Sequence, residues 1–247
     1  MTADFGEGAI MAISTDTDAI PGLADGDRLS AEEFERRDHA SPHIRKAELI
    51  EGVVYVASPV SDQHGVPHFD LTSWIGLYRL LTPHLSASVD GTIRLDPRNR
   101  PRPDVFLRIA PDHGGQSRTS ADCYVEGAPE FVAEVAVSSK TIDLNEKLEA
   151  YRRNNVREYV VWRVLDRAID WFILREGRYD RLPPGADGLY RSEVFPGLWL
   201  DPEALIRGDL AAVNRAVQLG LASPEHAAFV DRLRRAARPE DDGGDRP

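Results

Sequence analysis

The sequence predicts an α/β fold in which strand-like apolar runs alternate with helical segments. Two of the runs, at 103–109 and 130–138, each carry one acid among apolar neighbours, Asp104 and Glu134. An ionised carboxylate in such a run is costly unless a cation or hydrogen bonds compensate it. Acids at such places usually bind a metal ion or take part in chemistry, so these two residues are the first site candidates.

A helical segment at 141–154 follows the second run and carries the spacing Asp143-x3-Lys147-x3-Tyr151. At about 100° per residue, the apolar side chains of this segment form one stripe, and Lys147 lies on the border of that stripe. A lysine there can lean over the preceding strand and bring an ammonium group to its acid. An ordinary Asp143–Lys147 pair on a solvated face remains the alternative.

The remaining elements follow from local patterns. Ser30 with Glu33 three residues later forms a capping box and predicts a short helix. Apolar alternation predicts a strand at 53–57, and helical spacing of apolar residues predicts a helix at 62–81. The later part of the chain predicts strands near 86–95, 157–165 and 168–175, a short helix from residue 201, and tail helices at 210–219 and 224–235.

These elements predict three parts of the chain. Residues 1–28 are rich in Asp, Gly and Thr without periodicity and are expected to form a disordered leader. Residues 29–207 are expected to form one domain. Residues 208–247 are expected to form a helical tail with a disordered end.

Composition narrows the class of protein. The net charge of -11 weighs against a protein that coats nucleic acid through its phosphates. The single cysteine, Cys123, excludes an intrachain disulfide and a zinc site built on thiolates, which favours a cytoplasmic location. No apolar run approaches the roughly 18 residues of a membrane span, so no membrane association is expected.

Basic residues cluster in the sequence beside both acids. These clusters are open to two interpretations: charged side chains on a solvated surface, or side chains that contact phosphate groups. The cluster members are Arg94, Arg98, Arg100, Arg102 and Arg108 near the first acid, and Lys140, Lys147, Arg152, Arg153 and Arg157 near the second.

The ordered set of short motifs resembles the Uma-two family of putative restriction endonucleases over roughly residues 29–207. The motifs are Ala47-Glu48-Leu49-Ile50-Glu51-Gly52, Ser58-Pro59-x4-His64, Pro103-Asp104-Val105, Val132-Ala133-Glu134-Val135, Asp143-x3-Lys147-x3-Tyr151, Val156-Arg157-Glu158-Tyr159 and Phe195-Pro196-Gly197-Leu198. The resemblance implies the PD-(D/E)xK nuclease fold, a mixed central sheet flanked by helices with a metal site at its middle strands.

The resemblance also implies roles for single residues. Asp104 matches the acid of the PD motif, Glu134 matches the second acid, and Glu48 matches the first-helix acid of many such nucleases. Ala136 stands where the lysine of E-x-K is usual. Lys147 on the following helix is then the counterpart of that lysine.

Two carboxylates and a main-chain carbonyl, that of Val135, offer hard oxygen ligands for Mg²⁺ or Mn²⁺. We therefore expect a metal-dependent endonuclease that hydrolyses phosphodiester bonds, with nucleic acid as substrate and DNA favoured over RNA. The residues assigned to nucleic-acid contact are Arg102, Arg152, Arg153 and His64. A homodimer is left open.

Three classes of function remain at this stage. An active nuclease predicts that the two acids converge with Lys147 and that the flanking arginines line one groove. An inert nuclease-fold module for nucleic-acid or protein interaction predicts scattered acids or an occluded site. A structural partner in an assembly predicts exposed apolar patches around Trp162, Trp171 and Trp199.

Overall fold

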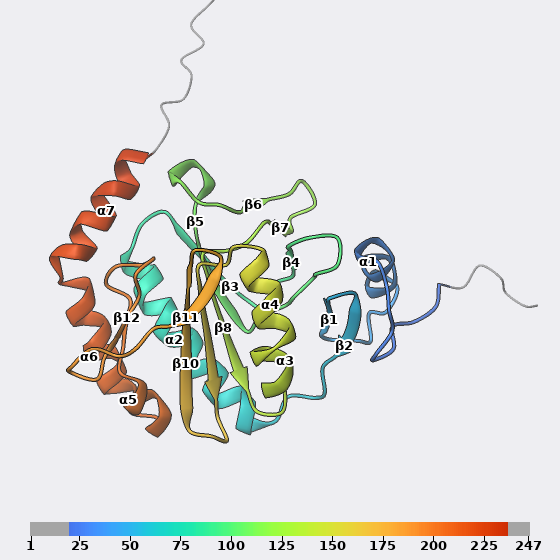
Figure 1. The fold of residues 1–247 in the computed structure, drawn as a ribbon, viewed down its shortest axis with the longest axis horizontal. Coiled ribbons are helices and arrows are strands. Elements are labelled where there is room, and N and C mark those ends of the chain that lie inside the picture. The colour runs from blue at the N-terminus through green and yellow to red at the C-terminus, as the bar shows by residue number, and fades with distance from the viewer. Residues whose placement is uncertain (1–19, 237–247) are drawn as a thin grey trace, which may run out of the picture.

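The computed structural model describes residues 20–236, which build a mixed six-stranded sheet with helices on both faces (Figure 1). The strands of the sheet are, in spatial order, β11 (Arg178–Arg181), β10 (Ala168–Arg175), β9 (Glu158–Arg163), β8 (Phe131–Ala136), β5 (Val105–Ile109) and β3 (Leu85–Val89). Neighbours are antiparallel except β8 and β9, which run parallel. The predicted mixed sheet flanked by helices is thus confirmed.

Two helical layers cover the sheet. One layer consists of α2 (Asp62–Leu81), α5 (Pro202–Arg207), α6 (Leu210–Leu221) and α7 (Pro224–Ala236), and the other of α3 (Lys140–Leu144) and α4 (Glu146–Arg153). Strand alternation divides the buried side chains between the layers. On β5, Val105 and Leu107 face the α2 side, whereas Phe106 faces the α4 side.

Smaller elements surround the sheet. They are α1 (Ala31–His39), β1 (Ala47–Ile50), β2 (Val53–Val56), β4 (Ile93–Arg94), the 3-10 turn η1 (Pro111–His113), β6 (Arg118–Thr119), β7 (Val125–Glu126), β12 (Tyr190–Arg191) and β13 (Trp199–Leu200). The hairpin of β1 and β2 turns through Glu51 and Gly52, which both have positive φ, as tight two-residue hairpin turns require. The Ser30 hydroxyl accepts the Glu33 N–H at 3.2 Å, so the predicted helix cap is confirmed.

Two local expectations differ from the structure. The single helix expected at 141–154 is interrupted at Asn145, whose φ of -126° and ψ of -81° are not helical. Residues 20–28, expected within a disordered leader, instead pack against β2, and the Gly26 N–H donates to the Val54 carbonyl at 2.8 Å. The rest of the leader and the end of the tail lie outside the described residues.

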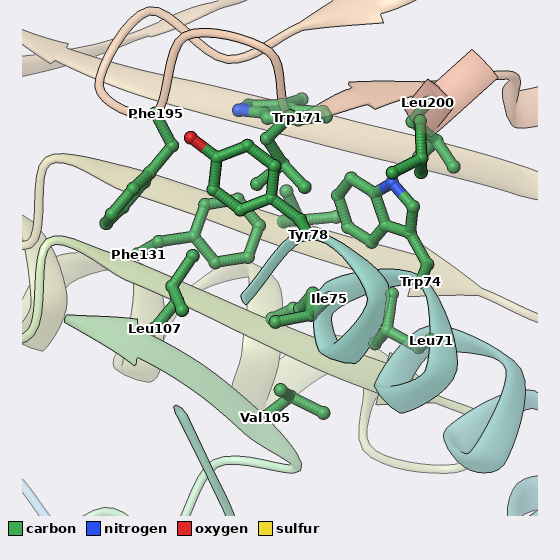
Figure 2. Close-up of a cluster of buried hydrophobic side chains, with 14 of the residues drawn as sticks. Leu71, Trp74, Ile75, Tyr78, Val105, Leu107, Phe131, Trp171, Phe195 and Leu200 are labelled. Atoms are coloured by element: carbon green, nitrogen blue, oxygen red, sulfur yellow. The ribbon is translucent and has the colours of Figure 1, made fainter. Parts of the chain in front are cut away.

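The larger core lies between α2 and the sheet (Figure 2). Trp74 meets Phe131 and Trp171 edge to face, with ring centroids 6.1 and 5.8 Å apart. Its indole N–H donates to the Trp199 carbonyl, which ties α2 to the segment after residue 195. Since Trp171 and Trp162 are buried, the exposed patch that a structural partner would need is not found around these two side chains.

Among the described residues, no helix combines the length and the apolar character needed to cross a membrane.

A buried carboxyl, Glu158 at the start of β9, anchors the loop before residue 195. It accepts hydrogen bonds from the Ser192 hydroxyl at 2.6 Å and from the Glu193 N–H at 2.7 Å. Burial raises the pKa of this carboxyl to about 7 and outweighs these hydrogen bonds, which lower it. The folded protein therefore holds the Glu158 proton more tightly than the unfolded chain does.

This difference predicts a pH dependence of stability. Between pH 4.5 and about 7 the folded state binds the extra proton, so the free energy of unfolding should fall as pH rises through this window. Glu158→Gln removes this titration. The difference in the free energy of unfolding between pH 5 and pH 8, measured by urea unfolding, should therefore be smaller in the variant by roughly 3 kcal/mol at most. Glu203→Gln, at an exposed position, is the control. Equal slopes in the wild-type protein and Glu158→Gln would contradict the assignment.

Candidate active site

The two predicted acids lie at the same end of adjacent strands. β5 and β8 pair antiparallel with Val105 opposite Ala133, which brings Asp104 beside Glu134 one step further along. The Val135 N–H donates to Asp104 Oδ2 at 2.8 Å, and the Asp104 N–H approaches Glu134 Oε2 at 3.3 Å. The strand register itself therefore holds both carboxyl groups in one place.

Lys147 reaches the same place from α4. Its Nζ lies 3.0 Å from Glu134 Oε1, 2.9 Å from Glu48 Oε2 and 3.5 Å from Asp143 Oδ1. The Tyr151 hydroxyl, one turn further along α4, donates to Glu134 Oε1 at 3.2 Å. Lys147 is only 4% exposed and Asp143 only 1%, so a solvated i,i+4 pair is the wrong description of these two residues.

Glu48 joins the site from a different element than the resemblance implied. It lies on strand β1 and not on the first helix. Its Oε1 accepts the Arg102 N–H at 2.6 Å, while Oε2 faces Lys147. The carboxylate thus connects the hairpin both to the segment before Asp104 and to α4.

Three further side chains contact Asp104: His64, which the sequence analysis assigned to nucleic-acid contact, and Lys46 and His68, which it missed. Lys46 Nζ donates to Asp104 Oδ1 at 2.9 Å and to Asp90 Oδ1 at 2.8 Å. His64 Nε2 lies 3.4 Å from Asp104 Oδ2, and His68 Nε2 lies 2.9 Å from the Asp104 carbonyl oxygen. The i,i+4 spacing of the two histidines on one helix is the signal that could have included His68.

Lys46 has a similar signal in the sequence. It stands two residues before Glu48, and the β1–β2 ladder continues past Ala47, because the Ala57 N–H donates to the Lys46 carbonyl at 3.0 Å. Residues two apart on a strand share a face. The motif that contains Glu48 could therefore have been extended to Lys46.

Burial gives the site acids unequal pKa values. It raises the pKa of Glu134 to about 8, since neighbouring carboxylates add to the effect of burial and together outweigh Lys147. Burial alone would also raise the pKa of Asp104, but His64, Lys46 and the Val135 amide hold it well below the usual range. Asp104 is therefore the ionised member of the pair, and Glu134 is the member that takes up a proton.

Lys147 keeps its charge although it is buried. Burial would lower its pKa, but the carboxylates around it raise the pKa well above the ordinary value. An ammonium group that stays protonated can donate hydrogen bonds and stabilise negative charge, but it cannot act as a base.

The donor set fits a divalent cation. Four buried carboxyl groups, those of Glu48, Asp104, Glu134 and Asp143, face two lysines, so the carboxyl groups outnumber the cations around them. Within residues 20–236 no three His, Cys, Asp or Glu side chains form a metal-binding group. Mg²⁺ seldom needs such a cage, because it binds through one or two carboxylates and completes its shell with waters and substrate phosphates.

The arginines assigned to nucleic-acid contact lie apart from one another. Arg152 pairs with Glu149 at 2.6 Å, and Arg153 pairs with Glu51. Arg102 lies at the site, where its Nε is 3.4 Å from the Asp90 carbonyl oxygen. Of the four assigned residues, only Arg102 and His64 make contacts at or next to Asp104 within the part of the chain that the structure describes.

Comparison of the chain with models of known protein families identifies the family to which it belongs. The model of Uma2, described as "Putative restriction endonuclease", matches residues 31–203. The chain belongs to this family. The resemblance drawn from the sequence motifs is thereby confirmed.

The fold agrees with a solved structure, that of a putative nuclease belonging to DUF820 from Anabaena variabilis. The two share 13% sequence identity, and the match covers 72% of this chain and 99% of that chain with a TM-score of 0.52. At this identity the likeness concerns the fold alone, and it confirms the restriction-endonuclease-like architecture. Comparison with curated proteins gives no match.

The enclosure of Lys147 predicts a large effect on stability. Lys147→Met removes the cation that compensates three buried carboxyl groups, and breaking a buried ion pair on one side costs about 3–5 kcal/mol. Lys140→Met is the matched control, because Lys140 is half exposed and pairs with Asp166, a contact worth about 0–1 kcal/mol. Urea unfolding of both variants measures the difference, and similar losses would show that Lys147 does not compensate the buried acids.

Proposed function

We propose that this chain is a metal-dependent endonuclease that hydrolyses phosphodiester bonds of nucleic acid, with DNA as its substrate. Its membership of a family of putative restriction endonucleases supports the reaction class. The observation that carries the proposal is the convergence of Asp104, Glu134 and the Lys147 ammonium at the ends of β5 and β8.

Asp104, Glu134 and the main chain of Val135 would hold Mg²⁺ or Mn²⁺. Such an ion supplies Lewis-acid stabilisation of charge on the scissile phosphate and lowers the pKa of a water molecule. Lys147 would orient the attacking water or stabilise the charge that develops on the phosphate, since it remains an ammonium. Tyr151 and Glu48 keep Glu134 and Lys147 in place through the hydrogen bond and ion pair already described.

One observation favours a second candidate, an inert nuclease-fold module for nucleic-acid or protein interaction. Asp104 and Glu134 are each only 3% exposed, so a substrate phosphate has little direct access to them. The arginines on α4 are also engaged with acids of the same chain. Binding of a DNA duplex without cleavage in Mg²⁺ or Mn²⁺ would favour this second function.

Two finer expectations belong to the same proposal. A cytoplasmic location agrees with the single cysteine, Cys123, which is free and exposed. Homodimer formation stays a prediction and is measured by analytical ultracentrifugation.

Asp104→Asn and Glu134→Gln should each abolish cleavage of plasmid DNA in Mg²⁺ or Mn²⁺, because each removes a proposed ligand of the ion. Glu134→Gln should stay as stable as the wild-type protein, since a neutral amide replaces a carboxyl group whose raised pKa already favours the neutral form. Asp104→Asn should lose stability, because an amide replaces a carboxylate that accepts hydrogen bonds from both Lys46 and the Val135 N–H. If both variants cut as fast as the Glu203→Gln control, the active site lies elsewhere.

Substitutions of Lys147 and Arg102 should have different effects, one on the turnover of the enzyme and the other on its affinity for DNA. Lys147→Ala should lower turnover by about two to three orders of magnitude, the scale of a lost transition-state donor, while affinity for DNA changes little. Arg102→Ala should weaken DNA binding and lower its salt slope by about one unit, with turnover at saturation retained. Single-turnover cleavage and fluorescence anisotropy, below the unfolding temperature of each variant, measure the two effects. The reverse pattern would make Lys147 a phosphate-binding residue.

A further inference from the structure

Lys46 connects a buried acid with a more exposed one. Its ammonium lies between Asp104, whose side chain is 4% exposed, and Asp90, whose side chain is 45% exposed. The lysine side chain itself is 21% exposed. Lys46 therefore stands between the proposed metal ligand and solvent.

The two oxygens of Asp104 have different neighbours. Oδ2 accepts the Val135 N–H and lies next to His64 Nε2. Oδ1 has one partner among the described residues, Lys46 Nζ at 2.9 Å. Lys46 Nζ therefore occupies the position beside Oδ1 that a divalent ion bound to this oxygen would need.

The strand ends provide a second position for the ammonium. β3 and β5 pair with Val89 opposite Val105, and the pairing continues one step, because the Asp90 N–H donates to the Asp104 carbonyl at 3.3 Å. Asp90 Oδ1 is 2.8 Å from Lys46 Nζ. Because Lys46 Nζ already contacts Asp90, an ammonium that loses Asp104 keeps a carboxylate partner.

The other site lysine has no such freedom. Lys147 is enclosed by three buried carboxyl groups and belongs to a packed helix. Of the two cations, Lys46 alone has a partner that faces solvent.

We propose that Lys46 is a positioning residue that substitutes for the divalent ion at Asp104 and is displaced onto Asp90 when the ion binds. This inference rests on the proposed function, since it needs an ion at Asp104 and Glu134. In the ion-free protein the ammonium compensates the Asp104 charge and keeps its carboxylate oriented. In the ion-bound protein it would stand at the entrance of the site, where it can contact a substrate phosphate.

The test is the affinity of the full chain for Mn²⁺, measured by isothermal titration calorimetry without nucleic acid. Lys46→Met removes the competing charge and should bind Mn²⁺ about tenfold more tightly, within the usual range of coupling between two sites. Lys46→Arg keeps the charge and should bind more weakly than Lys46→Met. Asp90→Asn removes the second position of the ammonium and should bind more weakly than the wild-type protein.

Controls keep the outcomes distinct. Lys140→Met, which removes an exposed lysine that pairs with Asp166, should leave the affinity unchanged. Thermal unfolding in EDTA shows which variants are folded, and Asp90→Asn, at a half-exposed position, tests the inference if Lys46→Met does not fold.

Two results would overturn the inference. If Asp104→Asn abolishes Mn²⁺ binding while Lys46→Met and Asp90→Asn bind like the wild-type protein, Lys46 does not compete with the ion and the proposed function stands. If neither the wild-type protein nor Lys46→Met binds Mn²⁺, the proposed metal-dependent function fails and the inference fails with it.

Discussion

Compensation of buried negative charge is the constraint on which the structure around the site depends. Each ionised group taken out of water costs several kcal/mol unless partners surround it. The carboxyl groups come from β1, the residue before β5, β8 and α3, and the lysine that faces three of them comes from α4. These elements must therefore meet in one arrangement, because any element that moved away would leave a buried charge without its partner. The raised pKa of Glu134 favours its neutral, protonated form, which lowers the negative charge that the two lysines must compensate.

The sequence could indicate the centre of the site because the centre has a local signature. An acid inside an apolar strand is visible from its immediate neighbours, and a lysine on the border of a helical stripe is visible from the spacing within one helix. Lys46 has a weaker signature, its place two residues before Glu48, and Asp90 has none. Lys46 contacts Asp104, 58 residues away in the sequence, and Asp90, 44 residues away, and both contacts follow from strand pairing that periodicity does not report.

The same limit explains which parts of the fold were predicted. The long helix α2 and the tail helices follow from helical spacing, and single strands follow from alternation, whereas the mixed sheet was implied by the family resemblance. The break at Asn145 does not, because the apolar spacing continues across it. The packing of residues 20–28 on β2 also lacks a local signal, since it consists mostly of main-chain hydrogen bonds such as that of Gly26 to Val54.

The position of the site lysine follows from how the helices cover the sheet. Val132, Glu134 and Ala136 share the face of β8 on which α4 packs, and Ala136 is buried in that apolar cluster. A long side chain at 136 would have to fit beneath the covering helices, whereas alanine lets them approach closely. The ammonium then comes with the covering helix, through Lys147, and its position depends on the packing of α4 and not on the strand. In this chain the site is therefore completed only when helix and sheet have docked, which couples the charge balance of the site to the folding of the core on that face.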